Sequence, residues 1–170
     1  MPVSAIVTTP GAGTANSYAT IAEATQYHAD HPYGTAWATA TDERRAQTLI
    51  TATRLIDEEF TFDGVPAFLD QALAWPRYGL VTRAGAVIAH TEVPRGLKDA
   101  TAEFARWLLA EDRTAESEAQ AQGLTKLKAG PVELTFSESA GRVIVPDVIA
   151  RMLAIWTVSG GGDQRRVIRV

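Results

Sequence analysis

The sequence predicts a mainly helical fold: a small bundle of about four helices with a β-hairpin or extended loop and flexible N- and C-terminal arms. Apolar residues recur every three or four positions over long stretches, as on the buried face of a helix. Several of these stretches begin with a capping residue or a proline. Only one short stretch, Val132 to Phe136, alternates apolar and polar residues as a strand does. With 170 residues, 46% of them hydrophobic, the chain is long enough for one domain with a sizeable core.

Two helices are expected in the first third of the chain. Thr20 and Glu23 form a capping box, and Pro32 ends the helix that they begin. Thr41 caps a second helix that runs to about Glu59, and residues 33–40 between the two are expected to form a loop around Trp37. The apolar face of this second helix is predicted to hold Ala46, Leu49, Thr53, Ile56 and Phe60.

The other two helices are expected to begin at prolines. Pro94 suits the first turn of the third helix, which is predicted to continue past Glu116 and to end before Gly123. Its buried stripe is Leu97, Thr101, Phe104 and Leu108, and its outward residues are Lys98, Asp99, Glu103 and Arg106. Pro146 can open the fourth helix, whose shared face is Ile149, Met152, Leu153 and Trp156.

The segments outside these helices suggest the domain organisation. We expect an N-terminal arm over residues 1–17, a helical domain over 18–158 and a Gly-hinged basic arm over 159–170. Residues 61–93 are rich in glycine and proline, so they are expected to be irregular. Leu124 to Lys128 is the expected hairpin partner of Val132 to Phe136.

Most catalytic and metal chemistry finds no support in the sequence. The chain has no cysteine, no phosphate-binding loop and none of the common nucleophile or zinc-protease motifs, so we expect a protein that is not an enzyme and needs no cofactor. His28 and His31, with Asp30 between them, could ligate a metal from one helix face, but a solvated helix end explains them as well and no metal is expected. No apolar run is long enough to span a membrane, and residues 1–10 do not resemble a signal peptide.

Two loop tryptophans leave nucleic-acid binding open as an alternative. Trp37 and Trp75 fall in predicted loops, where they could stack on the bases of a single strand or pack in the core. The net charge of −4 argues against general nucleic-acid binding, which usually goes with a basic protein.

The C-terminal residues are the most unusual part of the sequence. Gly160, Gly161 and Gly162 are expected to act as a hinge. The basic, β-prone residues after it are Arg165, Arg166, Val167, Ile168, Arg169 and Val170. They can dock as a strand on another protein, with the arginines reaching acidic groups, or form a frayed terminus.

Five stretches resemble, in their order, the head-to-tail connector or adaptor (head-completion) proteins of tailed bacteriophages. They are residues 15–28 (ANSYATIAEATQYH), 46–57 (AQTLITATRLID), 71–77 (QALAWPR), 93–104 (VPRGLKDATAEF) and 126–134 (LKAGPVEL after Lys126). Residues 78–91 and the arginine-rich tail have no counterpart in this resemblance.

The resemblance implies a structural virion protein made in the host cytoplasm and located at the head-tail interface. It implies a homo-oligomeric ring, commonly a dodecamer, that docks on the portal protein and joins the capsid to a downstream tail or stopper protein. Double-stranded DNA would pass through the lumen without sequence-specific binding, and no membrane would be involved. In this hypothesis the tail from Arg165 to Val170 is the portal-docking arm, and Lys126 and Lys128 face the channel or a neighbouring subunit. A single-stranded nucleic-acid-binding module is the alternative function.

Overall fold

The structure is a computed structural model, and it describes residues 5–113, 126–129, 132–135 and 144–158. These residues form five helices and two small antiparallel ribbons, which confirms the mainly helical fold with a β-hairpin. The helices are α1 (Ile21–Ala29), α2 (Thr35–Thr39), α3 (Asp42–Glu59), α4 (Arg95–Ala110) and α6 (Asp147–Leu153). The strands are β1 (Val65–Pro66), β2 (Arg77–Tyr78), β3 (Lys126–Ala129) and β4 (Val132–Thr135).

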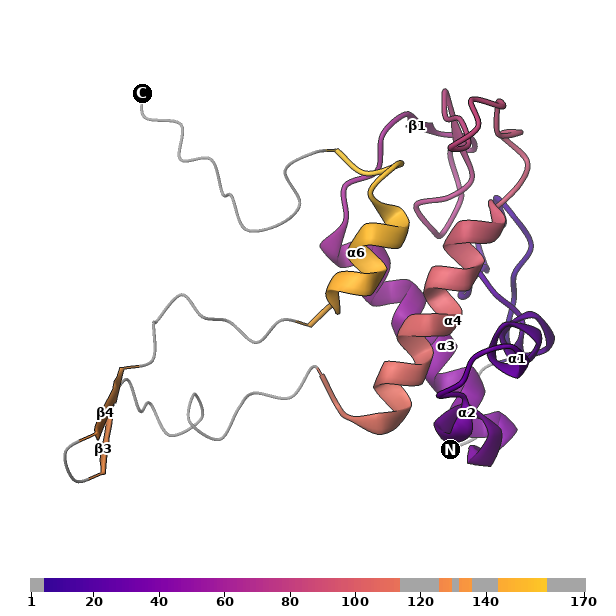
Figure 1. The fold of residues 1–170 in the computed structure, drawn as a ribbon. Helices are drawn as coiled ribbons and strands as arrows, with labels where there is room; N and C mark the ends of the chain where they lie inside the picture. The colour runs from indigo at the N-terminus through magenta and orange to yellow at the C-terminus, as the bar shows by residue number, and fades with distance from the viewer. Residues whose placement is uncertain (1–4, 114–125, 130–131, 136–143, 159–170) are drawn as a thin grey trace, which may run out of the picture. The chain divides into compact units, whose positions relative to one another are not determined.

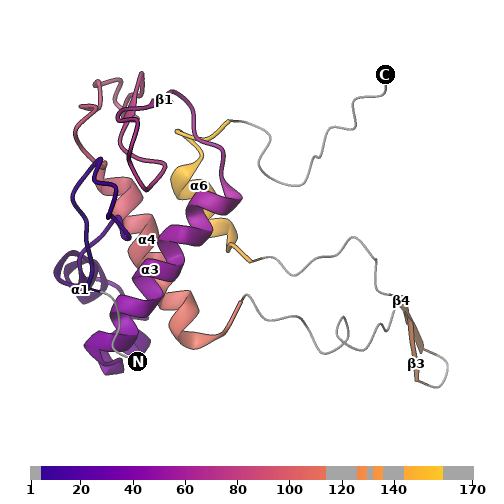
Figure 2. The same ribbon diagram turned by 180° about the vertical axis from the view of Figure 1, so that it is seen from behind.

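The core forms where α4 packs against the other helices. α3 and α4 lie side by side, α6 packs on α4, and α1 and α2 lie near the start of α3 (Figures 1 and 2). The irregular segment from Phe60 to Pro94 gathers at the end where α3 stops and α4 starts. Buried apolar side chains from these helices, among them Leu49, Ile56, Leu97, Phe104 and Ile149, fill the space between them.

Local signals in the sequence set the helix starts as expected. The Thr20 hydroxyl accepts a hydrogen bond from the Glu23 N–H at 3.1 Å, and the Glu23 carboxylate accepts one from the Thr20 N–H at 2.8 Å. This is the predicted capping box, in which two otherwise unsatisfied donors are paired. Thr41 caps α3 in the same way by accepting from the Arg44 N–H at 3.3 Å, and α3 ends at the predicted residue.

Three details of the helices differ from the prediction. Residues 35–39 form the short helix α2 instead of a loop, because Trp37 packs into the core with 1% of its surface exposed. Glu103, expected to face outward, is 3% exposed and bonded to Arg106 and Trp107. α4 ends at Ala110, whereas the helix was predicted to continue past Glu116. Residues 114–125 lie outside the described residues.

A glycine lets α4 and the residues after α6 approach closely at the end that carries the irregular segment. A Cβ atom at Gly96 would lie only 2.8 Å from the ring of Trp156, so no larger residue fits without a shift of that buried ring. The Trp156 indole N–H donates to the carbonyl of Val81 at 3.0 Å, which ties the irregular segment to the chain that follows α6. This hydrogen bond holds the irregular segment against the helical core.

The predicted hairpin is confirmed in its backbone. β3 and β4 pair antiparallel with Lys126 opposite Thr135 and Lys128 opposite Glu133. The β3–β4 hairpin belongs to a unit distinct from the one that holds the five helices. The proposed division into an arm over 1–17, a helical domain over 18–158 and an arm over 159–170 stays a prediction. Among the described helices, none combines the length and the apolar character that crossing a membrane requires.

Candidate nucleic-acid interface

Three of the four tryptophans are buried and not available for base stacking. Trp37 and Trp75 are each 1% exposed, and Trp156 is 6% exposed. The Trp37 indole donates to the Thr25 hydroxyl at 3.1 Å, and the Trp75 ring makes edge contacts with Phe62 and Trp156. The interpretation of Trp37 and Trp75 as stacking platforms is therefore wrong: both are core residues that the sequence pattern could not distinguish from exposed ones.

The irregular segment is held together by one arginine. The Arg77 guanidinium donates to four backbone carbonyls: those of Asp63 at 2.7 Å, Gly64 at 2.9 Å, Ala74 at 3.0 Å and Phe62 at 3.1 Å. These bonds join the chain just after α3 to the chain that leads into β2. The rigid fork of a guanidinium suits this task because it directs several N–H groups in one plane.

The carboxylate of Asp57 anchors the same segment from the last turns of α3. It accepts a hydrogen bond from the Ala74 N–H at 2.9 Å and another from the Tyr18 hydroxyl. Burial raises the pKa of Asp57 above its usual value, although both hydrogen bonds act to lower it. Burial, followed by the nearby Asp57 charge, also raises the pKa of Tyr18.

The residue after Arg77 is presented to solvent. Tyr78 lies opposite Val65 across the β1–β2 ribbon and is 45% exposed. Its ring stacks on His90, with ring centres 4.4 Å apart and planes 17° from parallel. Successive side chains of a strand point to opposite sides. Because the Arg77 side chain points inward to the backbone carbonyls, the Tyr78 side chain points outward. We call Tyr78 and His90 together the aromatic platform.

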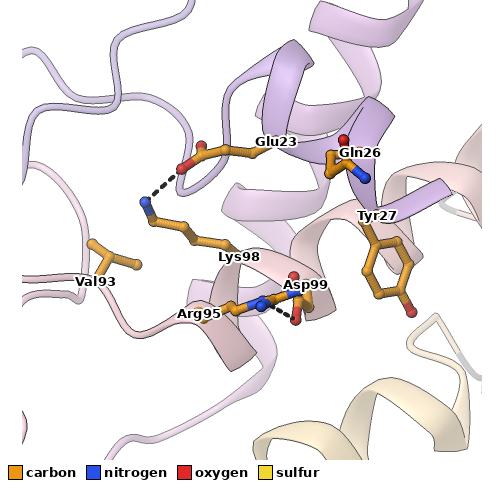
Figure 3. Close-up of a pocket in the computed structure, with 7 residues that line it drawn as sticks. All are labelled: Glu23, Gln26, Tyr27, Val93, Arg95, Lys98 and Asp99. Carbon is orange, nitrogen blue, oxygen red and sulfur yellow. Dashed lines mark hydrogen bonds and ion pairs between the residues drawn. The ribbon is translucent and has the colours of Figure 1, made fainter. Parts of the chain in front are cut away.

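A cleft lies where the first residues of α4 meet α1 (Figure 3). It has a volume of about 450 Å³. Its lining residues are Glu23, Gln26 and Tyr27 from α1 and Val93, Arg95, Lys98 and Asp99 from the start of α4. We call it the α1–α4 cleft.

Two cations and two carboxylates set the electrostatics of the α1–α4 cleft. Lys98 Nζ lies 2.7 Å from Glu23, and Arg95 Nε lies 3.5 Å from Asp99 (Figure 3). Burial would raise the pKa of Glu23, but hydrogen bonds from Lys98 and Thr20 outweigh it and lower that pKa. For Asp99 the burial prevails over the nearby Arg95 and raises the pKa. Burial, with the negative charge of Glu103, raises the pKa of Tyr27 to about 12.

The two helix histidines serve packing and ion pairing. His28 is 5% exposed, with Nε2 at 3.0 Å from the carbonyl of Ala102, and burial lowers its pKa. The description of His28 as part of a solvated helix end is therefore wrong. His31 Nε2 lies 3.6 Å from Glu103. Among the residues that the structure describes, no three histidines or carboxylates gather as a metal site would require.

The other residues predicted as functional are placed only in part. Lys126 and Lys128 lie in β3, where their backbone pairs with β4. The hinge Gly160, Gly161 and Gly162 and the arm Arg165, Arg166, Val167, Ile168, Arg169 and Val170 lie outside the described residues. Their proposed roles as hinge and docking arm stay predictions of the sequence.

Comparison with protein families decides the identity of the chain. Residues 4–170 match the model of a family described as "Putative DnaT-like ssDNA binding protein". The chain belongs to this family. The match extends over the helical part, the hairpin and the arginine-rich tail alike. No curated protein and no solved structure matched the chain.

Membership of the DnaT-like family corrects the resemblance to phage head-to-tail adaptors. The portal, the tail or stopper protein, the dodecameric ring and the double-stranded DNA of its lumen were inferred from that resemblance, and the family match favours single-stranded DNA instead. The stretches that suggested the adaptor describe fold features: residues 46–57 contain the buried face of α3, and residues 71–77 end in the Arg77 clamp. Any helical bundle of this kind needs such faces. Location in a virion stays a prediction that has lost this support.

The aromatic platform and the α1–α4 cleft were both missed in the sequence. Tyr78 and His90 are separated by an irregular stretch with no period, so nothing in the pattern pairs them. Lys98 and Asp99 were treated only as outward helix residues. β2 contains only Arg77 and Tyr78, which is too short a strand for its alternation to be recognised in the sequence.

Proposed function

We propose that this protein binds single-stranded DNA and that one base stacks on the exposed face of Tyr78. The observation that carries the proposal is the aromatic platform, a solvent-exposed tyrosine backed by His90 at 4.4 Å, in a chain of the DnaT-like family. Every base has a π face, so a single aromatic platform binds a strand with little regard to sequence. A duplex hides those faces, and the platform would therefore prefer a single strand.

The platform is well suited to stacking because it is fixed before the strand arrives. Arg77 and the buried Trp75 hold the chain on one side of Tyr78, while the Ile88 N–H bonds the Leu80 carbonyl at 2.9 Å near His90. A preorganised ring loses little conformational entropy on binding. The same segment exposes further apolar side chains: Val65, opposite Tyr78, and Val81 and Val87, which pair with each other.

The acidic composition predicts that base stacking contributes more to the affinity for single-stranded DNA than phosphate contacts do. The net charge is −4, and apart from Arg77, which is engaged by four backbone carbonyls, the cations nearest in sequence to the platform are Arg83 and Arg95. Each phosphate neutralised on a single strand adds about −0.7 to the slope of log affinity against log salt. Two or three such phosphates would give a slope of about −1.4 to −2.1, which is shallow for a nucleic-acid-binding protein. We propose binding without catalysis and without a cofactor.

The test is fluorescence anisotropy with a labelled oligo-dT strand at low salt. Replacing Tyr78 by Leu should weaken binding by about 1–3 kcal/mol, the range for one stacked base. Tyr33→Leu is the matched control, because Tyr33 is 73% exposed and also lies beside a histidine, outside the platform. The proposal is wrong if the wild-type protein does not bind the strand at low salt. It is also wrong if Tyr78→Leu binds the strand as tightly as Tyr33→Leu.

A further inference from the structure

We propose that the α1–α4 cleft binds a second nucleotide of the same single strand, with its phosphate on Arg95 and its base beside Tyr27. This inference rests on the proposed function and assigns it a second contact point. It starts from the composition of the cleft, in which an aromatic ring, an amide, two cations and two carboxylates line one hollow (Figure 3). A volume of about 450 Å³ is in the range of sites that enclose small organic ligands.

Arg95 has the geometry to take the phosphate. Its side chain is 90% exposed and approaches Asp99 through Nε at 3.5 Å. Among the interactions of the described residues, this is the pair that engages Arg95, which leaves its two terminal nitrogens available to the oxygens of a phosphate. Arginine commonly binds phosphate through two such parallel bonds.

Other groups that line the cleft suit a base. Tyr27 is half-buried and offers its ring, and the amide of exposed Gln26 can both donate to and accept from the polar edge of a base. When ionised, Asp99 and Glu23 can only accept hydrogen bonds, and the N–H groups of a base can donate them. Single-stranded recognition generally combines stacking with hydrogen bonds to exposed base edges.

The balance of charge favours a nucleotide over inorganic phosphate. Lys98 is already engaged by Glu23 at 2.7 Å, and Asp99 stands beside Arg95, so the lining carries two positive and two negative groups. A bare phosphate would meet repulsion from both carboxylates. A nucleotide places its anion at the exposed rim, on Arg95, and its neutral base against the carboxylates.

The cleft and the aromatic platform are close enough to share a strand. Arg95 follows His90 by five positions, and such a segment spans at most about 18 Å when fully extended. Val93, within this segment, lines the cleft. A strand whose base stacks on Tyr78 therefore reaches the cleft within a few nucleotides.

The first test measures the salt dependence of oligo-dT binding for Arg95→Gln. Removing one phosphate-binding side chain should lower the magnitude of the log–log slope by about 0.7. The affinity at low salt should fall about tenfold, as expected when a charge-assisted hydrogen bond is removed. Arg54→Gln is the control, because Arg54 is an exposed cation (63%) of α3 with a carboxylate neighbour, like Arg95, and does not line the cleft.

The second test locates the base directly. Oligo-dT carrying 5-iodouracil is photocrosslinked to the wild-type protein, and the attached peptides are identified by mass spectrometry. We expect crosslinks at Tyr78 and at Tyr27, and loss of the Tyr27 crosslink in Tyr27→Leu with the Tyr78 crosslink retained.

The outcomes separate the two proposals. If the wild-type protein fails to bind the strand, the proposed function fails and the cleft inference fails with it. If the protein binds and needs Tyr78, but Arg95→Gln matches Arg54→Gln and no crosslink reaches Tyr27, the proposed function stands and the cleft inference is overturned. Tyr27→Phe, which keeps the ring, should bind as the wild type does if the ring is what the base contacts.

Discussion

Glu103 is a buried carboxylate whose charge depends on its neighbours. It accepts hydrogen bonds from the Trp107 indole at 3.1 Å and from the Arg106 guanidinium, and His31 and Tyr27 face it from the end of α1. Burial acts to raise the pKa of Glu103, but the hydrogen bonds and charge of Arg106 outweigh it and lower that pKa. A carboxylate with a lowered pKa stabilises the folded state when ionised.

The sign of the pH dependence follows from that shift. The unfolded chain binds the Glu103 proton more tightly than the folded one, so the stabilisation is present above the ordinary glutamate pKa of about 4.3. It is lost as the pH falls below that value and through the lower folded pKa. At about pH 7, Glu103→Gln should reduce the free energy of unfolding by about 1.5–3 kcal/mol, the range for hydrogen bonds to charged groups. The free energy of unfolding of this variant should then fall less on acidification than that of the wild type.

Urea unfolding over a series of pH values from neutral to acidic checks this prediction. Glu58→Gln is the control, because Glu58 is an exposed glutamate of α3, 3.9 Å from Arg54, and surface pairs contribute about 0–1 kcal/mol. Equal acid sensitivity in the Glu103 variant and the wild type would show that this carboxylate does not govern the acid limb of stability.

At the scale of elements, the sequence predicted the helices well and the segment between them poorly. The starts of α1 and α3 follow from Thr20 and Thr41, whose side chains satisfy the first N–H groups of each helix, and such signals are local. The β3–β4 hairpin follows from the alternation of apolar and polar residues in the second of its two strands. The irregular segment has no period, and its structure depends on contacts with residues far away in sequence, such as the Trp156 indole on Val81.

The candidate site was less predictable for the same reason. Tyr78 meets His90 because Arg77 binds four carbonyls that precede it by up to 15 positions, and no spacing rule encodes such a clamp. Trp37 and Trp75 were ambiguous because a loop tryptophan is buried or exposed according to tertiary packing alone. The outward position of Glu103 was wrong because the carboxylate bonds Arg106 and Trp107 of its own helix and also meets His31 from just after α1, a tertiary contact that the apolar spacing does not encode.

Arg77 is the residue through which the irregular segment can be tested as an element. Arg77→Lys keeps the charge but offers one nitrogen where the guanidinium reaches four carbonyls. We expect a loss of about 2 kcal/mol in unfolding free energy, since hydrogen bonds from charged groups contribute about 1.5–3 kcal/mol. Amide hydrogen exchange should accelerate in residues 62–66 and 74–80, and oligo-dT affinity should fall because Tyr78 is no longer held.

The control for this prediction is Arg83→Lys in the same segment. Arg83 is exposed and donates to one carbonyl, that of Arg151, at 3.3 Å. This variant should leave exchange and binding close to the wild type. If Arg77→Lys also binds oligo-dT normally while its exchange accelerates, the platform does not depend on the clamp, and stacking on Tyr78 must be adaptable.

At the scale of the whole molecule, the tail after Val158 carries a net positive charge, whereas the rest of the chain is net negative. The net charge is −4, yet the residues after Val158 contain Arg165, Arg166 and Arg169 against the single acid Asp163. The family match continues through this tail to residue 170. Under the proposed function, these arginines are candidates for further phosphate contacts, because they are clustered and face a single acid in this part of the sequence.

A chain that ends at Val158 should therefore bind oligo-dT more weakly at low salt and with a shallower salt slope. Each phosphate that is no longer neutralised lowers the magnitude of the slope by about 0.7, so loss of the one or two phosphate contacts beyond that of Arg95 would lower it by about 0.7 to 1.4. Binding at high salt, where stacking on Tyr78 dominates, should change little. The full-length chain with Arg165, Arg166 and Arg169 replaced by Gln should reproduce the truncation, which separates the charge of the tail from its length. An unchanged slope in both variants would assign the phosphate contacts to the helical part, with Arg95 first among the candidates.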